Sequence, residues 1–236
     1  MDIKGKTILV TGANRGIGAS LVKSLLKNGA GKIYAAARNP AALPDFGDKR
    51  VVPLKLDITK PADVAAAAKT TGAVDVLINN AGIANGGDIF ADVQSADMDV
   101  NYYGTTRMVQ AYAPLLEKQG GGVIANVISM VGLASIPYLA GYSASKAALF
   151  SATQAARAAL KPKKIDVVGI FPGPIDTDLA KDLPLPNKAS PDDTADDIVQ
   201  GLIAGDEDIY PDPASKQLSG LWGSKPKELE KVFSAF

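Results

Sequence analysis

The chain contains no cysteine and no histidine in its 236 residues. These absences exclude disulfide bonds, thiolate nucleophiles and imidazole bases, and they remove the commonest ligands of zinc. We therefore expect no metal site, and any catalysis must rely on other side chains.

An excess of charge is also absent, because 25 basic residues balance 25 acidic residues and the two signs are interspersed. Such a surface lacks the electrostatic footprint of a protein that binds nucleic acid or an anionic membrane. Residues 1–6 are followed by an apolar run that is too short for a signal peptide. We expect a cytoplasmic protein whose partners are small molecules and further copies of itself.

The stretch from Gly120 to Ser145 lacks any charged residue and is long enough to cross a bilayer. Polar residues and a proline, among them Asn126, Ser129 and Pro137, interrupt it. We predict a buried strand, a loop and the start of a helix here instead of a membrane span.

Apolar runs alternate with helical patterns along the chain, and no shift in composition marks a second domain. The predicted strands are 7–10, 32–37, 51–56, 74–78, 123–128 and 165–171. The predicted helices are about 16–29, 61–70, 97–118, 142–161, 192–204 and 226–235. This alternation predicts a single α/β domain over residues 1–236, a doubly wound parallel sheet (Rossmann fold) with helices on both faces in three layers. Ligands of such sheets lie beyond the carboxyl ends of the strands.

A glycine-rich turn follows the first predicted strand and opens the first helix. It has the sequence Thr-Gly-Ala-Asn-Arg-Gly-Ile-Gly from Thr11 to Gly18. Bare backbone N–H groups and the positive end of the helix dipole suit a diphosphate. The same glycines also serve plain turns and helix entries, so the turn is a hypothesis for dinucleotide binding. Its candidate contacts are Gly12, Asn14, Arg15, Gly16, Ile17 and Gly18.

Arg38 follows the second predicted strand, where an acidic side chain would hold the ribose hydroxyls of NAD. Arg38 and Arg15 offer two cations where a 2′-phosphate would lie, which predicts NADP(H) in preference to NAD(H). Each arginine taken separately is equally well explained as a solvated surface residue.

Two further turns follow predicted strands and suit the rest of a dinucleotide. Asp57 and Ile58 would contact the adenine, although an aspartate that caps the next helix explains Asp57 as well. The run Asn79-Asn80-Ala81-Gly82 would let the backbone approach a ribose, and a plain turn explains it nearly as well.

Ser129, Tyr142 and Lys146 are expected at the same edge of the sheet. Ser129 ends the fifth predicted strand, and Tyr142 and Lys146 share one face of a helix at a spacing of four. A free phenol has a pKa near 10, and a nearby cation favours the phenolate. We expect Lys146 to lower the pKa of Tyr142 so that it exchanges a proton with an alcohol or carbonyl.

These motifs, in this order, resemble the short-chain dehydrogenase/reductase family in its shorter, single-domain branch. The resemblance covers nearly the whole chain, through the glycine turn, Asn79–Gly82, Tyr142-Ser-Ala-Ser-Lys146 and a Pro-Gly motif that begins at Pro172. It implies an NADP-dependent alcohol dehydrogenase or carbonyl reductase. Its implied catalytic residues are Asn101, which holds a relay water, Ser129, which binds the substrate oxygen, Tyr142, the acid/base, and Lys146, which binds the nicotinamide ribose.

The resemblance also implies contacts with the nicotinamide end, a lid and an assembly. The nicotinamide contacts are Pro172, Gly173, Ile175 and Thr177, besides Tyr142 and Lys146. Residues 175–190 are expected to form a lid over the substrate. A homo-oligomer, a tetramer or a dimer, is expected, and the alanine-rich face of the helix that follows Tyr142 agrees with it.

Two other functions stay open on the sequence alone. One is a cofactor-binding regulatory protein that has no catalytic activity. The other is an epimerase or dehydratase of the family's longer branch, whose extra substrate domain this chain lacks. The substrate itself is not identified, but a largely apolar pocket is expected from Ile83, Leu133, Ile136, Tyr138, Ile175, Leu179 and Leu183.

Overall fold

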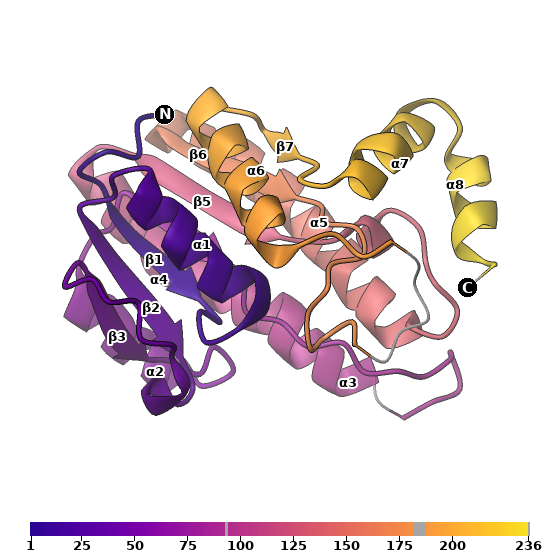
Figure 1. Ribbon diagram of the computed structural model, residues 1–236, viewed down its shortest axis with the longest axis horizontal. Helices are drawn as coiled ribbons and strands as arrows, with labels where there is room; N and C mark the ends of the chain where they lie inside the picture. Colours follow the sequence, from indigo (N-terminus) through magenta and orange to yellow (C-terminus); the bar gives the residue numbers. More distant parts are fainter. Residues whose placement is uncertain (93, 182–186, 236) are drawn as a thin grey trace.

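A computed structural model describes residues 1–92, 94–181 and 187–235, and its centre is a parallel sheet of seven strands (Figure 1). The strand order is β3-β2-β1-β4-β5-β6-β7, and all neighbours run parallel. The strands are β1 (Thr7–Thr11), β2 (Lys32–Ala37), β3 (Val51–Lys55), β4 (Val76–Asn79), β5 (Gly122–Val127), β6 (Ile165–Ile170) and β7 (Asp208–Ile209). The order reverses between β1 and β4, so the predicted doubly wound parallel sheet is confirmed.

Helices cover both faces of this sheet. They are α1 (Gly16–Lys27), α2 (Pro61–Thr71), α3 (Gln94–Asp97), α4 (Thr105–Gln119), α5 (Ala140–Leu160), α6 (Pro191–Ala204), α7 (Pro213–Ser224) and α8 (Pro226–Phe233). Helices α1 and α6 lie together on one face, and α2, α4 and α5 lie on the other (Figure 1).

Successive residues of β1 explain why the strands are apolar throughout. Ile8 and Val10 pack into the core beneath α1 and α6, whereas Leu9 packs into the core beneath α2 and α4. Side chains alternate between the faces of a strand, so a sheet covered on both sides needs apolar residues at every position.

The long helix predicted at 97–118 is divided in the structure. A π-helical stretch, Met98–Gly104, separates α3 from α4 and contains the buried Asn101. Asn101 is therefore a fully buried polar residue within an irregular part of the helix.

Two elements near the C-terminus were not predicted. Strand β7 has only two residues, and α7 carries two glycines, Gly220 and Gly223, that weaken a helical pattern. Both elements lie beyond the last predicted strand, and α7 and α8 project together at one end of the molecule (Figure 1).

The uncharged stretch from Gly120 to Ser145 forms β5, a loop with a 3₁₀ turn at Met130–Gly132, and the start of α5, as predicted. In the described part of the chain no helix has both the length and the apolar character that crossing a membrane requires.

Candidate active site

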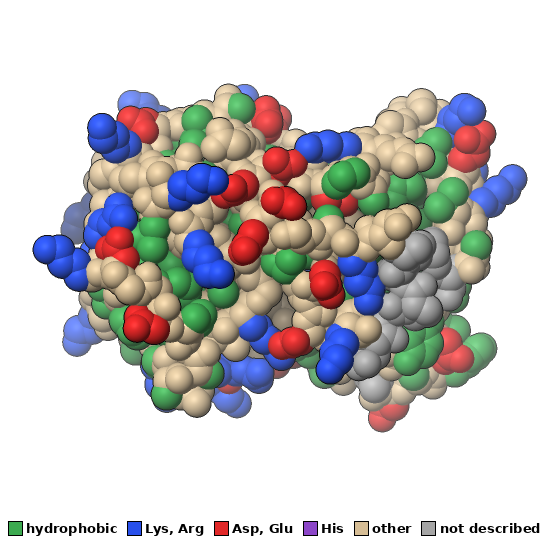
Figure 2. All heavy atoms as spheres, in the orientation of Figure 1, with side chains coloured by type: hydrophobic (Ala, Val, Ile, Leu, Met, Phe, Trp, Pro, Cys, Tyr) green, Lys and Arg blue, Asp and Glu red, His purple; other side chains and the backbone are tan. Residues whose placement is uncertain are grey.

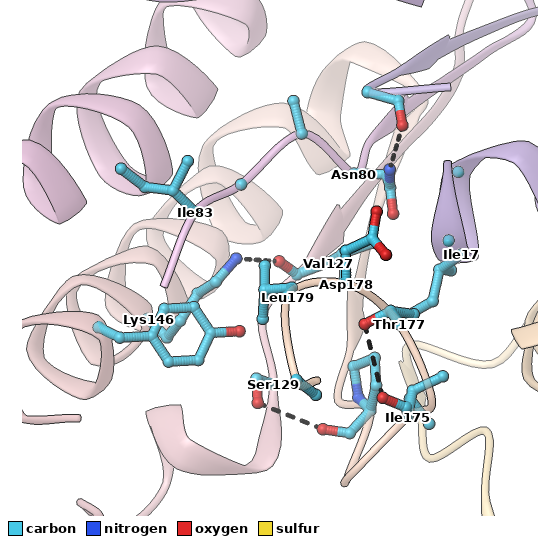
Figure 3. A pocket seen from close by; sticks show the side chains of 18 of the residues that line it. Ile17, Asn80, Ile83, Val127, Ser129, Lys146, Ile175, Thr177, Asp178 and Leu179 are labelled. Atoms are coloured by element: carbon cyan, nitrogen blue, oxygen red, sulfur yellow. Dashed lines mark hydrogen bonds between the residues drawn. The ribbon is translucent and has the colours of Figure 1, made fainter. Parts of the chain in front are cut away.

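One cavity of about 740 Å³ lies at the carboxyl ends of the strands (Figure 3). It is lined by every predicted cofactor contact and by three of the four predicted catalytic residues, Ser129, Tyr142 and Lys146. The fourth, Asn101, lies behind the wall, fully buried. Residues that are far apart in the sequence therefore meet in one place, although their roles remain predictions.

The glycine turn brings bare backbone to this cavity. A Cβ on Gly12, whose φ is +66°, would lie 2.8 Å from the Cα of Ala81, and a Cβ on Gly18 would lie 2.1 Å from the carbonyl oxygen of Gly12. Arg15 is the N-cap of α1, and no side chain caps the helix. The first N–H groups of α1 and its dipole are thus available to an anion, as a dinucleotide requires.

Asn80 holds the glycine turn in place. Its Nδ2 donates to the carbonyl oxygens of Thr11 at 3.0 Å and Gly12 at 3.2 Å. The Thr11 hydroxyl in turn accepts from the backbone N–H groups of Asn80 and Ala81, each at 3.0 Å. The Asn79–Gly82 run is therefore more than a plain turn, because it fixes the end of β4 against the end of β1.

The two arginines differ in their surroundings. Arg15 donates to Asp178 at 3.1 Å, and both side chains are well exposed. Arg38 is exposed at the rim of the cavity and forms no ion pair within the described residues. Arg38 is thus the more available of the two cations.

Asp57 lies next to Arg38 and does not cap α2. Its Oδ1 accepts from the N–H of Thr59 at 3.0 Å and from the Thr59 hydroxyl at 2.7 Å, while the N-cap of α2 is Lys60. Burial works to raise the pKa of Asp57, but the Thr59 hydrogen bonds and Arg38 outweigh it, so the net pKa is lowered. The capping explanation for Asp57 is therefore wrong.

Lys146 is almost fully buried, and its Nζ donates to the carbonyl oxygen of Val127 at 2.8 Å. The Nζ lies 5.6 Å from the centre of the Tyr142 ring. Burial lowers the pKa of Lys146 to about 7. An amine that titrates in this range exchanges protons at neutral pH, which an ordinary lysine does not.

Burial also raises the pKa of Tyr142 to about 12, with the neighbouring Ser129 hydroxyl acting in the opposite direction. We expected Lys146 to lower this pKa, and that expectation is wrong for the protein alone. Two desolvated groups each favour their neutral form, and burial is the largest cause of both shifts.

Ser129 adopts a strained backbone conformation, with φ of 126° and ψ of 155°. This region is almost confined to glycine and costs about 1–3 kcal/mol. The hydroxyl lies at the cavity, where it donates to the carbonyl oxygen of Pro172 at 3.3 Å (Figure 3). Strain of this kind, at a residue that faces Tyr142, indicates a positioned functional group.

Most of the hydrogen bonds that the Asn101 side chain can form are made with neighbouring protein groups. Its Oδ1 accepts from Ile83 N–H at 2.9 Å, and its Nδ2 donates to Ile83 O at 2.8 Å and to the Ser145 hydroxyl at 2.9 Å. A Cβ on Gly82 would lie 3.0 Å from this Oδ1 and 3.5 Å from Lys146 Nζ, so both groups face the same glycine. One acceptor site on Oδ1 is left for a water.

The expected lid at 175–190 is fastened at its base. Asp176 N–H donates to Ala189 O and Ala189 N–H donates to Pro174 O, each at 2.9 Å. Ile175, Thr177 and Leu179 line the cavity on this side (Figure 3). Residues 182–186, which include the predicted pocket residue Leu183, lie outside the described residues.

The wall beyond Ser129 and Tyr142 is apolar, but its composition differs from the prediction. Ile83, Ile136, Ile175 and Leu179 line the cavity, whereas Leu133 packs into the core and Tyr138 is exposed at the surface. Further lining residues were missed, namely Met130, Val131, Leu139, Ala214, Leu218, Val232 and Phe233. The last four come from α7 and α8, whose position against the cavity leaves no signal in the local sequence.

Comparisons with known proteins identify the family of the chain. A family model described as short chain dehydrogenase matches residues 6–187. A short chain dehydrogenase from Burkholderia cenocepacia, solved in complex with NADP, is 36% identical with a TM-score of 0.92, over 99% of both chains. A structure from Burkholderia phymatum, in complex with NAD, is 22% identical over 98% and 96% of the two chains and has the same fold, with a TM-score of 0.84. An L-rhamnose 1-dehydrogenase (NAD(P)(+)) from Sphingomonas is 32% identical over 92% of this chain and 96% of its own.

Proposed function

The chain belongs to the short chain dehydrogenase family, and we propose that it is an NADP(H)-dependent oxidoreductase. Membership of this family supports an NAD(P)-dependent dehydrogenase or reductase activity in general. The finer proposal is that a hydride passes between the nicotinamide and the carbonyl carbon of a ketone or aldehyde, or of the corresponding secondary alcohol. The observation behind it is the meeting of Ser129, Tyr142 and Lys146 on one wall of the cavity that begins at the glycine turn.

The cofactor, when bound, supplies or accepts the hydride. Tyr142 is the group that exchanges the proton of the substrate oxygen, and the Ser129 hydroxyl binds the same oxygen. With its pKa raised to about 12, the Tyr142 phenol holds its proton at neutral pH and is ready to donate it to a carbonyl. For alcohol oxidation the phenol must first lose that proton.

Lys146 and Asn101 serve the proton path behind Tyr142. A pKa of about 7 lets Lys146 take up and release protons near neutral pH. The remaining acceptor site on Asn101 Oδ1 would hold a water next to Lys146, because both side chains face Gly82. Lys146 is also proposed to bind the nicotinamide ribose.

The preference for NADP(H) rests on Arg38. No acidic side chain directly follows β2, where Ala35, Ala36 and Ala37 precede Arg38, so the carboxylate that would favour NAD(H) at that position is absent. Arg15, in the glycine turn, lines the same cavity and pairs with Asp178.

The substrate is proposed to be a carbonyl compound with an apolar substituent. The described lining beyond Ser129 and Tyr142 is mostly apolar and comes from the 130–139 loop, the lid, α7 and α8, while the lid also contributes Thr177, Asp178 and Asn187. Burying an unpaired charge against such a wall costs several kcal/mol, which disfavours anionic substrates.

A homo-oligomer is also proposed. Ala144, Ala147 and Ala155 on α5 are exposed, so they do not pack within the chain, and small side chains allow close approach of a second helix. Light scattering at micromolar concentration tests this proposal, and a monomer would contradict it.

The deciding experiment measures NADPH consumption with a panel of neutral alkyl and aryl ketones. Wild-type turnover that disappears in Tyr142→Phe, while NADPH still binds, supports the reductase. NADPH binding without turnover of any ketone supports the alternative, a cofactor-binding regulatory protein on the same fold.

A further inference from the structure

Asp97 is a fully buried carboxylate at the end of α3 that the proposed mechanism does not use. Its Oδ2 has no hydrogen-bond partner in the described part of the structure. The other fully buried aspartate, Asp212, is explained, because it caps α7 and accepts from Gly173 N–H. A buried carboxylate without full pairing is costly, so Asp97 calls for an explanation of its own.

Asp97 holds the segment that follows β4. Its Oδ1 accepts from the N–H of Asn85 at 3.2 Å and from Asn85 Nδ2 at 3.3 Å. One turn further along, Asn101 holds Ile83 of the same segment through two hydrogen bonds. Asp97 and Asn101 are thus two successive anchors for one short stretch of chain.

The anchored segment leads directly to the start of α5. Gly87 N–H donates to Tyr138 O at 2.7 Å, and Ala140 N–H donates to Gly87 O at 3.2 Å. Tyr142 lies in the first turn of that helix. The position of Asp97 is therefore coupled through the backbone to the end of α5 that carries the proposed acid/base.

The charges near Asp97 come from two elements. Helix α5 packs against α3 and contributes Lys146 and the phenol of Tyr142. The π-helical stretch contributes Asp99, which is paired with Arg107 at 3.2 Å. Among these groups the Lys146 ammonium is the one whose field acts on Asp97.

We propose that Asp97 is a positioning residue that fixes the 83–85 segment and serves as the buried counter-charge of the Lys146 ammonium. This inference rests on the proposed function, since it assigns the control of the same proton-transfer site. Burial raises the pKa of Asp97, whereas Asn85 and Lys146 lower it. Asp97 in turn raises the pKa of Lys146, which burial lowers. It also raises the pKa of Tyr142, which burial raises as well.

The test is Asp97→Asn, which removes the charge but keeps an oxygen that accepts from Asn85. Loss of a negative charge makes deprotonation of Lys146 and Tyr142 easier. For alcohol oxidation, kcat/KM should increase with pH as the Tyr142 phenol loses its proton. In Asp97→Asn this increase should therefore occur about one pH unit lower, which is the smallest shift expected from a nearby charge. Asp99→Asn is the matched control and should leave the profile in place, because Asp99 is half exposed and already paired.

A purely structural Asp97 would leave the profile unchanged in Asp97→Asn, and that result overturns the proposal. If Asp97→Asn does not fold, Asp97→Ser replaces it. That variant removes the same negative charge and keeps an oxygen on the side chain, so its profile should shift in the same direction, and an unmoved profile overturns the proposal.

Absorbance titration of the Tyr142 phenol, with Tyr142→Phe as the reference, separates this inference from the proposed function. A wild-type protein that turns over no ketone or alcohol contradicts the proposed function. The phenol of Asp97→Asn should still ionise at lower pH than that of wild type, and equal titration curves overturn the role of Asp97.

Discussion

Replacement of Arg38 by leucine should convert an NADP(H)-preferring protein into one with little preference. A charge-assisted hydrogen bond to a phosphate contributes about 1.5–3 kcal/mol, which is roughly ten- to a hundredfold in affinity. Arg38 is exposed, and solvent screening reduces such contributions. We therefore expect NADPH to weaken by about tenfold in Arg38→Leu, whereas NADH, which lacks the 2′-phosphate, should change little.

The contribution of Arg15 to NADPH affinity depends on its ion pair with Asp178. To reach a phosphate, Arg15 must give up an exposed ion pair of 3.1 Å, which is worth about 0–1 kcal/mol. Arg15→Ala should therefore weaken NADPH less than Arg38→Leu does. Asp178→Asn removes the competing carboxylate and should strengthen NADPH by up to about fivefold, the equivalent of 1 kcal/mol.

The assay is kcat/KM for NADPH and NADH with one ketone, together with direct titration of each cofactor. Arg107→Leu is the matched control, because Arg107 pairs with Asp99 and does not line the cavity. If the wild type prefers NADH, or if Arg38→Leu weakens both cofactors equally, Arg38 does not read the phosphate and the NADP(H) assignment fails.

Three further predictions concern the proton donor, the glycine turn and the buried amine. Tyr142→Phe should lower kcat by about two orders of magnitude or more with NADPH affinity nearly intact, and near-normal turnover in steady-state kinetics would rule out the role of Tyr142. Gly18→Ala should abolish binding of both cofactors in a fluorescence titration, because the new Cβ would lie 2.1 Å from a carbonyl oxygen; Gly220→Ala, where nothing lies within 4 Å, should bind normally. Because Lys146 titrates at about 7 in the folded chain and at 10.5 when unfolded, the unfolded state binds more protons between these values. The free energy of unfolding should rise from pH 7 to 10, and urea denaturation should show a smaller rise in Lys146→Met.

The sequence is informative wherever function depends on residues that are close along the chain. The glycine turn, Asn80–Gly82 and Ser129 each follow a strand directly, Tyr142 and Lys146 lie in the helix that the loop after β5 opens, and parallel strands bring these points to one edge. Their meeting in a single cavity follows from the parallel direction of the strands, which the alternation of strands and helices predicts.

The apolar wall could not be predicted in the same way. Leu218, Val232 and Phe233 come from α7 and α8, and the N-cap of α7, Asp212, accepts from Gly173 N–H just after β6. They are held by apolar packing, through Leu229 and Phe233, against the core that contains Met130 and Leu139. Apolar packing leaves no motif, so a local reading of the chain gives no reason to prefer these residues over Leu133 or Tyr138.

The error in the pKa of Tyr142 has a different cause, and it bears on the mechanism. The prediction from the sequence considered only the attraction between the Tyr142 phenolate and the Lys146 ammonium. In the folded chain, both groups are also desolvated and both are affected by the charge of Asp97. These effects raise the pKa of Tyr142 and, on balance, lower that of Lys146, so at neutral pH the proton lies on the phenol. In the proposed mechanism, a protonated phenol favours carbonyl reduction, which consumes that proton, over alcohol oxidation, which must remove it first. A base that works in the oxidative direction needs either higher pH or a further positive charge near Tyr142, and an oxidised nicotinamide would bring such a charge when it binds.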